Sequence, residues 1–203
     1  MVEWIIYNGG TKMRLWKAYS GHMLIESDVG TQEQRHDLLK QAYDFKKFHH
    51  SNSNSNDGCW RGNIKYERAE WLEQALMQQI EQTVNYYLEE DRAFAHMFKG
   101  GDPYVESWTN INEPGSMNRL HTHKAFNFSA IYYVQAHHTG DLVFLNPANL
   151  DLSASYLGPG TSRMHYTPND GDLVMWPSWI PHEVERNESD IQRVCIAFNI
   201  RFQ

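Results

Sequence analysis

The sequence predicts a mostly β protein of the sandwich or jelly-roll class, with helices flanking the sheet. Seven short runs rich in β-branched and aromatic residues follow one another in the second half of the chain, at about 103–112, 126–136, 141–146, 163–167, 171–176, 182–186 and 192–202. Turn signals separate these runs, at Glu113–Ser116, His137–Gly140, Pro168–Gly171 and Asn187–Asp190. The first half instead shows helical periodicity. With 203 residues, 41% of them hydrophobic, the chain can form one domain with a sizeable core.

The chain divides into a mixed helical and strand-containing part at 1–102 and a β-rich part at 103–203. No strong linker separates the two parts, because Gly100 and Gly101 are typical of a helix stop and not of a hinge. We therefore expect a single domain in which the first part packs on the second.

Two helices are predicted in the first part. Thr31 and Gln34 have the spacing of a capping box, and apolar residues follow at helical intervals as far as Tyr43. The second helix is expected at about 66–90, where every fourth residue is apolar: Leu72, Leu76, Ile80, Val84 and Leu88. Such a stripe indicates an amphipathic helix that covers one face of a sheet.

The segment between these helices is expected to be a polar loop. Its sequence, Ser51–Gly58, is rich in Ser and Asn, and we expect Cys59, directly after it, to lie in the same polar loop region. Two interpretations stay open for this loop, a mobile flap or an inert exposed segment.

Charge and cysteine content narrow the class of protein. A formal charge of −7 argues against a nucleic-acid partner, since an acidic chain gains nothing from releasing phosphate counterions. Cys59 and Cys195, the two cysteines, lie far apart in sequence and suit a reducing compartment. The N-terminus has no pattern of a signal peptide, and no apolar run approaches the roughly 20 residues that span a bilayer. We expect a cytoplasmic protein without a membrane partner.

Three histidines form a candidate metal site. His121 and His123 are two residues apart beside a predicted strand, where alternate side chains point the same way. His182 lies in a later strand, and a jelly roll brings strands that are distant in sequence side by side. Imidazole suits iron, zinc, copper and nickel, so the ligands alone do not name the metal. The competing interpretation is that these histidines are structural or exposed.

Arg193 follows His182 by eleven residues (193 − 182 = 11) and is a candidate anion anchor. If the turn between them centres on Glu188 and Ser189, Val184 faces Arg193 in a hairpin and His182 lies one diagonal step away. A guanidinium grips a carboxylate with two parallel hydrogen bonds. A metal with such an anchor suits 2-oxoglutarate, whose keto-acid end chelates a metal. The competing interpretation is a surface ion pair on an edge strand.

Four blocks of the chain carry further information through their order and spacing: 121–134 (HTHKAFNFSAIYYV), 140–147 (GDLVFLNP), 169–182 (NDGDLVMWPSWIPH) and 192–199 (QRVCIAFN). Together they resemble the iron(II)/2-oxoglutarate-dependent oxygenases, most closely a branch from bacteria and phages that is related to the prolyl hydroxylases. The resemblance covers about 105–203, and residues 1–100 show no comparable match.

This resemblance implies a double-stranded β-helix, a squashed jelly roll with iron(II) at its open mouth. It implies that His121 and His182 are metal ligands and that Arg193 binds the distal carboxylate of 2-oxoglutarate, with Tyr133 beside it. Further candidates for the lining of the cosubstrate pocket lie on the strand before the first histidine, namely Trp108 and Asn110.

The chain departs from the family pattern at His123, where the broader superfamily has an aspartate. Three outcomes are open: His123 completes a three-histidine site, it turns away and leaves two histidines with water or chloride, or the site binds metal poorly. We favour the first, because strand geometry already points His123 toward the metal. Glu113 and Asp141 are alternative carboxylates, but both lie at predicted turns.

The resulting prediction is a 2-oxoglutarate-dependent dioxygenase that hydroxylates a C–H bond of a small-molecule or peptidyl substrate. Two alternatives come from other classes. A three-histidine cupin-type dioxygenase would keep the metal site without needing Arg193 for 2-oxoglutarate. A non-catalytic jelly-roll binding module would use exposed aromatic residues such as Trp176 and Trp179.

Overall fold

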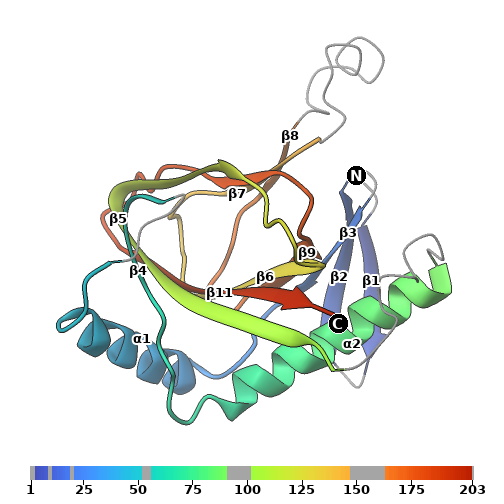
Figure 1. Ribbon diagram of the computed structural model, residues 1–203, viewed down its shortest axis with the longest axis horizontal. Coiled ribbons are helices and arrows are strands. Elements are labelled where there is room, and N and C mark those ends of the chain that lie inside the picture. The colour runs from blue at the N-terminus through green and yellow to red at the C-terminus, as the bar shows by residue number, and fades with distance from the viewer. Residues whose placement is uncertain are drawn as a thin grey trace.

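The computed structural model describes residues 3–8, 11–18, 21–51, 56–90, 102–146 and 163–202. Its core is a strongly curled antiparallel sheet, with two helices along one side (Figure 1). The elements of the first half are β1 (Glu3–Asn8), β2 (Thr11–Ala18), β3 (Gly21–Glu26), α1 (Gln32–Lys46), β4 (Asn56–Gly62) and α2 (Glu70–Glu90). Those of the second half are β5 (Tyr104–His121), β6 (Phe128–Gln135), β7 (Leu142–Leu145), β8 (Arg163–Tyr166), β9 (Leu173–Pro177), β10 (His182–Val184) and β11 (Arg193–Arg201).

The seven strands predicted in the second half are confirmed as β5 to β11. The strand order is β1-β2-β3-β9-β6-β11-β5-β10-β7-β8, with β4 added beside β5. Strands of the first half thus extend the sheet through the β3–β9 and β4–β5 pairings. Among the described residues, no helix is long and apolar enough to cross a membrane.

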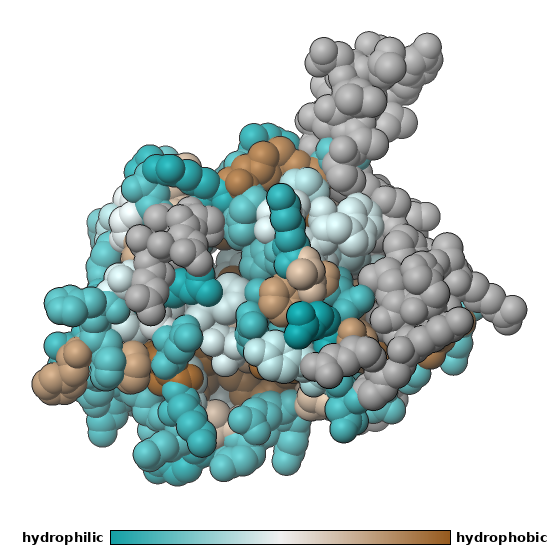
Figure 2. All heavy atoms as spheres, in the orientation of Figure 1, coloured by the Kyte–Doolittle hydropathy of each residue, from teal (hydrophilic) through white to brown (hydrophobic). Residues whose placement is uncertain are grey.

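Alternation along the strands creates two separate cores. On β6, Ala130 and Tyr132 face the helices, whereas Ile131 and Tyr133 face the inside of the curled sheet. The outer core joins α1 and α2 to β6, β9 and β11, and the inner core joins β6 and β9 to β7 and β8. Hydrophilic residues cover most of the face in Figure 2, with hydrophobic residues in small patches. Because the inner core fills only part of the curl, polar side chains can line its mouth.

The first predicted helix is confirmed, including its start. The side chain of Thr31 accepts a hydrogen bond from the backbone N–H of Gln34 at 3.2 Å, and the Gln34 side chain accepts one from the N–H of Thr31 at 2.7 Å. These reciprocal bonds satisfy two N–H groups that a helix start otherwise leaves unpaired.

The second predicted helix is confirmed, but it begins at Glu70 and its last apolar position was wrong. Leu72, Leu76 and Ile80 are buried against the sheet, whereas Leu88 is 42% exposed and Tyr87 is 2% exposed. Each four-residue step overshoots a full helical turn by roughly 40°. The stripe therefore rotates away from the sheet by its fifth member, and Tyr87 replaces Leu88 in the core.

The expected loop at Ser51–Gly58 is corrected in its last part. Residues 52–55 lie outside the described residues, but Asn56 to Gly58 already belong to β4, which pairs with β5. Cys59 is therefore buried in a strand and not placed in a polar loop, with its Sγ 3.3 Å from Oδ1 of Asn112. Polar composition was misleading here, because the pairing that makes this segment a strand lies more than fifty residues away in sequence.

The turn predicted at Glu113–Ser116 is also wrong, because β5 runs through it. The segment is a bulge: Cys59 of β4 pairs with Asn112, whereas Asp57 pairs with Met117. Gly115 supplies the positive φ of 85° that this bend requires. The bulge redirects β5, so that its first half pairs with β11 and its end pairs with β10.

The expected hairpin between Val184 and Arg193 does not form. β5 lies between β10 and β11, so that Val184 pairs with Asn118 and Arg193 pairs with Asn112. A short turn at Asn187–Asp190 was compatible with a hairpin, but in this topology the chain crosses from one layer of the curl to the other.

Candidate metal centre

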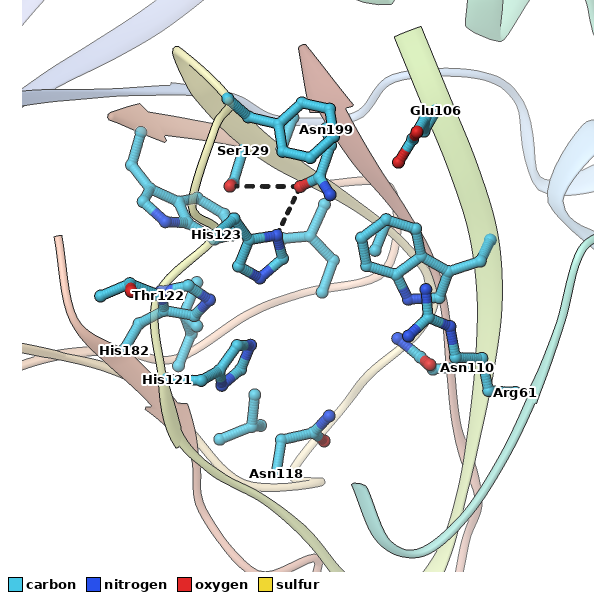
Figure 3. A pocket seen from close by; sticks show the side chains of 18 residues that line it. Arg61, Glu106, Asn110, Asn118, His121, Thr122, His123, Ser129, His182 and Asn199 are labelled. Atoms are coloured by element: carbon cyan, nitrogen blue, oxygen red, sulfur yellow. Dashed lines mark hydrogen bonds between the residues drawn. The ribbon is translucent and has the colours of Figure 1, made fainter. Parts of the chain in front are cut away.

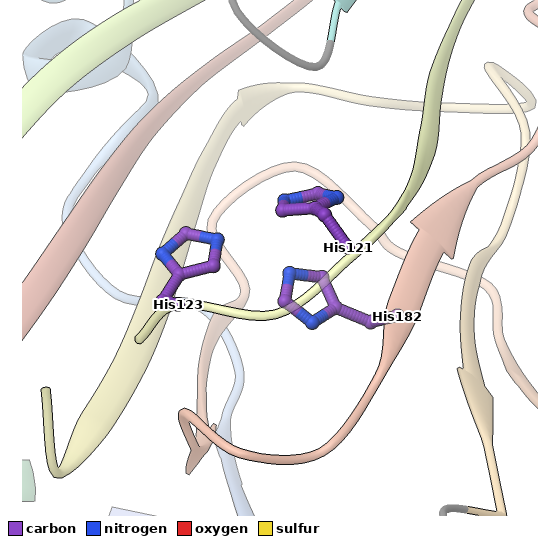
Figure 4. A group of neighbouring side chains, drawn as sticks. All are labelled: His121, His123 and His182. Atoms are coloured by element: carbon purple, nitrogen blue, oxygen red, sulfur yellow. The ribbon is translucent and has the colours of Figure 1, made fainter. Parts of the chain in front are cut away.

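Three histidines converge at the mouth of the curled sheet (Figure 4). His182 begins β10 and pairs directly with His121, the last residue of β5, and His123 follows two residues later. The centroid of the His121 ring lies 4.4 Å from the centroid of the His182 ring and 5.0 Å from that of the His123 ring. One nitrogen from each ring lies within 4.8 Å of the others, a spacing that can hold a single metal ion.

Hydrogen bonds at Nδ1 fix the orientation of each histidine ring and determine which ring nitrogen carries the proton. Nδ1 of His121 lies 2.6 Å from the backbone oxygen of Arg119, and Nδ1 of His182 lies 3.0 Å from that of Ile180. Nδ1 of His123 has Oδ1 of Asn199 as its partner. Each partner is an oxygen that accepts, so each Nδ1 carries the proton and donates it. The Nε2 lone pair of every ring is therefore available for a metal.

The same histidines are held in the neutral form that metal ligation needs. Burial lowers the pKa of His121 and lowers that of His182 far below its ordinary value. Burial is also the main reason that the pKa of His123 falls to about 4, with the bond to Asn199 opposing the change. Around neutral pH no proton competes with a metal for these rings.

Arg193 and Tyr133 are buried, lie outside the lining of the cavity beside the histidines, and each leave one polar atom without a partner among the described residues. Arg193 is 1% exposed, and its Nη1 donates to the backbone oxygen of Thr139 at 2.6 Å. Its Nη2 and the hydroxyl of Tyr133 are buried without a hydrogen-bond partner among the described residues. Tyr133 pairs across the sheet with Cys195, which places it on the inward face beside Arg193. Two unpaired donors of this kind fit an anion such as a carboxylate.

A cavity of about 390 Å³ opens above the histidines. Two further predicted residues, Trp108 and Asn110, line it from β5, as expected for residues two apart on one strand face. Sequence reasoning missed Arg61, Glu106 and Asn199, which also line this cavity (Figure 3). Alternation along β11 from Arg193 would have placed Asn199 on the inward face, but nothing in the local sequence points to Arg61.

The alternative carboxylates lie elsewhere. Glu113 accepts hydrogen bonds from Lys46 at 2.6 Å and from Gln192 at 2.5 Å. Asp141 lies in a separate surface group with His165 and Glu185. Within the described part of the chain, the group that holds the three histidines contains no carboxylate.

Comparisons with known proteins agree with this geometry. Residues 106–199 match the family model described as "Putative 2OG-Fe(II) oxygenase", a range that contains all seven predicted site residues. Residues 106–199, the part of the chain that holds the candidate site, thus match the 2-oxoglutarate/iron(II) oxygenases in sequence. This match makes the protein a 2-oxoglutarate-dependent oxygenase, with iron(II) as its metal and 2-oxoglutarate as its cosubstrate. No curated protein matches the chain in sequence.

Solved structures establish the fold of this oxygenase as a double-stranded β-helix. A Pseudomonas putida prolyl-4-hydroxylase matches with a TM-score of 0.61 at 16% identity, over 89% of this chain and 92% of that one. A prolyl hydroxylase from Trichoplax adhaerens, in complex with a peptide fragment of hypoxia inducible factor, matches with a TM-score of 0.62 at 14% identity, over 89% and 83%. HygX from Streptomyces hygroscopicus, with nickel and 2-oxoglutarate bound, matches with a TM-score of 0.55 at 12% identity, over the same shares.

The residues of the oxygenase fit both groups. Three neutral imidazoles with free Nε2 lone pairs are good ligands for iron(II). The unpaired atoms of Arg193 and Tyr133 fit a buried carboxylate. The one departure from the usual donor set is His123 in place of a carboxylate.

Proposed function

We propose that this protein is a dioxygenase that hydroxylates a C–H bond of its substrate, with His121, His123 and His182 as iron ligands. The observation that carries the proposal is the convergence of one ring nitrogen from each of three histidines, while Nδ1 of each ring has a hydrogen-bond partner of its own. The proposal selects the three-histidine outcome over a site with two histidines.

In this proposal Arg193 and Tyr133 hold the distal carboxylate of 2-oxoglutarate. Nη1 of Arg193 stays on the backbone oxygen of Thr139, which orients the guanidinium, while Nη2 and the Tyr133 hydroxyl donate to the carboxylate. Trp108 and Asn110 line the cavity above the histidines, where we propose that they form part of the cosubstrate pocket. When bound, iron(II) and 2-oxoglutarate supply the oxidising chemistry: one oxygen atom of O₂ enters succinate with loss of carbon dioxide, and the other enters the C–H bond.

The substrate class is left open by the relatives. The prolyl hydroxylase from Trichoplax adhaerens binds a peptide, and HygX has been solved with hygromycin B. We propose a small-molecule or peptidyl substrate, a cytoplasmic location, and a single domain in which residues 1–102 pack on the barrel.

The two rival functions have less support from the residues. A cupin-type dioxygenase without 2-oxoglutarate would leave the buried, unpaired Nη2 of Arg193 without a role. A binding module that uses exposed aromatic residues does not suit Trp176, which is 3% exposed.

The test is anaerobic reconstitution with iron(II), followed by titration with 2-oxoglutarate. Chelation of iron by the keto acid should give a weak visible charge-transfer band. His182→Ala should lose the band, whereas the matched variant His165→Ala, which removes a histidine from strand β8, outside the three-histidine group, should keep it. Iron binding without a band would favour the cupin-type dioxygenase. Neither iron nor a band would favour the binding module.

A further inference from the structure

Arg61 is a cation built into the wall of the cavity. It lies on β4 and pairs with Asn110 of β5, and its Cζ stands 4.2 Å from the centre of the Trp108 ring. Stacking on an aromatic face holds a guanidinium flat and orients its N–H groups sideways. Figure 3 shows Arg61 beside Asn110 on the wall opposite the three histidines. A molecule in the cavity would therefore lie between Arg61 and the metal centre.

The surroundings of Arg61 favour the arrival of a negative charge. The side chain is partly buried, and this burial lowers the pKa of Arg61, with the charge of Glu106 acting in the opposite direction. The positive charge of Arg61 also reaches His121 and His123, where it helps to lower the pKa of both rings. A partly desolvated cation gains more from an anionic partner than an exposed one does.

The ligand set adds to this positive potential. A facial set of two histidines and a carboxylate contributes one negative charge to the iron, but His123 is neutral. With iron and 2-oxoglutarate bound, the cavity would thus carry one more positive charge than in an oxygenase with the usual set. A negatively charged group on the substrate restores this balance.

We propose that the substrate of this oxygenase carries a carboxylate, and that Arg61 binds it. The role in catalysis rests on the proposed function, but the binding of a carboxylate does not. The carboxylate belongs either to a small molecule or to an acidic side chain of a peptide.

Replacing Glu106 provides a second test of the proposal, with the opposite expected effect on carboxylate binding. It lines the same cavity, and its Oε1 accepts a hydrogen bond from the Tyr104 hydroxyl at 3.2 Å. Because its charge acts on Arg61, it competes with a substrate carboxylate for the same cation. Removing Glu106 should strengthen carboxylate binding, whereas removing Arg61 should weaken it.

The experiment measures binding by isothermal titration calorimetry on the metal-free full chain. The probes are the twenty L-amino acids against their carboxamides, and capped tripeptides with Asp or Glu against the same peptides with Asn or Gln. At least one carboxylate probe should bind, with its amide partner weaker by roughly 10- to 100-fold, as for loss of a charge-assisted hydrogen bond. Which set binds distinguishes a small molecule from an acidic peptide.

Variants assign the binding to Arg61. Arg61→Gln should lose the same factor, Arg61→Lys should retain part of it, and Glu106→Gln should bind more tightly than the parent. Arg68→Gln, which removes an exposed arginine paired with Asp37, is the control and should leave binding unchanged. Thermal unfolding of each variant checks that the fold is intact.

Different experimental outcomes would refute the carboxylate-binding role of Arg61 and the proposed oxygenase function. Carboxylate binding that depends on Arg61, without any turnover of 2-oxoglutarate, would refute only the proposed function. If no carboxylate probe binds, or if amides bind equally well, the inference is wrong. It is also wrong if Arg61→Gln raises the KM for 2-oxoglutarate and leaves substrate binding unchanged, since Arg61 would then serve the cosubstrate.

Discussion

Replacing Arg193 by Gln should weaken 2-oxoglutarate binding while leaving iron binding intact. The guanidinium is 1% exposed and keeps one bond to Thr139, so its other face can give a carboxylate a charge-assisted bond that water does not replace. Loss of such a bond costs about 2–3 kcal/mol, which corresponds to a roughly 30- to 150-fold rise in the dissociation constant. Arg193→Lys keeps the positive charge but lacks the planar set of N–H donors of the guanidinium, so we expect an intermediate rise in the dissociation constant of 2-oxoglutarate.

The assay is an anaerobic titration of the iron-loaded protein with 2-oxoglutarate, followed through the charge-transfer band. Arg201→Gln is the matched control, because it removes an exposed arginine from the end of the same strand, β11. Equal affinities for the parent, Arg193→Gln and Arg201→Gln would refute the assignment of Arg193 as the cosubstrate anchor. Iron content and the unfolding temperature must be measured alongside, because Gln at 193 also loses the bond to Thr139.

Three further predictions test the support of the site and the fold. Asn199→Leu removes the acceptor of His123 and should lower iron affinity roughly 10- to 100-fold, while Asn199→Asp should retain an acceptor; competition with a chelator measures both. For the metal-free protein, the pKa of His123 is lower when folded than the ordinary 6.5, so protonation favours the unfolded chain. Its unfolding temperature should therefore fall as the pH drops from about 6.5 toward 4, and His123→Gln should show a shallower fall. In chemical denaturation, Tyr87→Ala should cost about 3–5 kcal/mol of stability, whereas Leu88→Ala should cost less than about 0.5 kcal/mol; equal costs would contradict the rotation of the helical stripe.

Local signals in the sequence were sufficient for the individual elements of the fold. The capping box at Thr31 and the turn residues between the later strands act within a few residues of themselves, so a single sequence contains them completely. The predictions from the sequence are wrong where the structure of a segment depends on pairing with a strand that is distant in the sequence. β4 is a strand only because β5 lies beside it, and the expected β10–β11 hairpin is replaced because β5 lies between those two strands.

The candidate site follows the same division. His121 and His123 could be associated from their spacing alone, whereas His182 required the expected jelly-roll topology and Arg193 an assumed hairpin, and the resemblance to a family then gave both residues a role. Arg193 pairs with Asn112 of β5 and not with Val184 as the expected hairpin required, although its side chain does point into the barrel. Arg61 escaped detection because its segment was interpreted as part of a loop region, and only the pairing with β5 brings it to the cavity.

The histidine at position 123 and the asparagine at position 199 are complementary in their hydrogen bonding. An imidazole that offers Nε2 to a metal must place the proton on Nδ1, and that proton needs an acceptor. Oδ1 of Asn199 is this acceptor. A carboxylate at position 123 would be repelled by this oxygen, so the amide of Asn199 would have to turn and present its NH2 group instead. In the present orientation of Asn199 the surroundings of His123 therefore suit a histidine, which supports the proposed three-histidine site over one with two histidines.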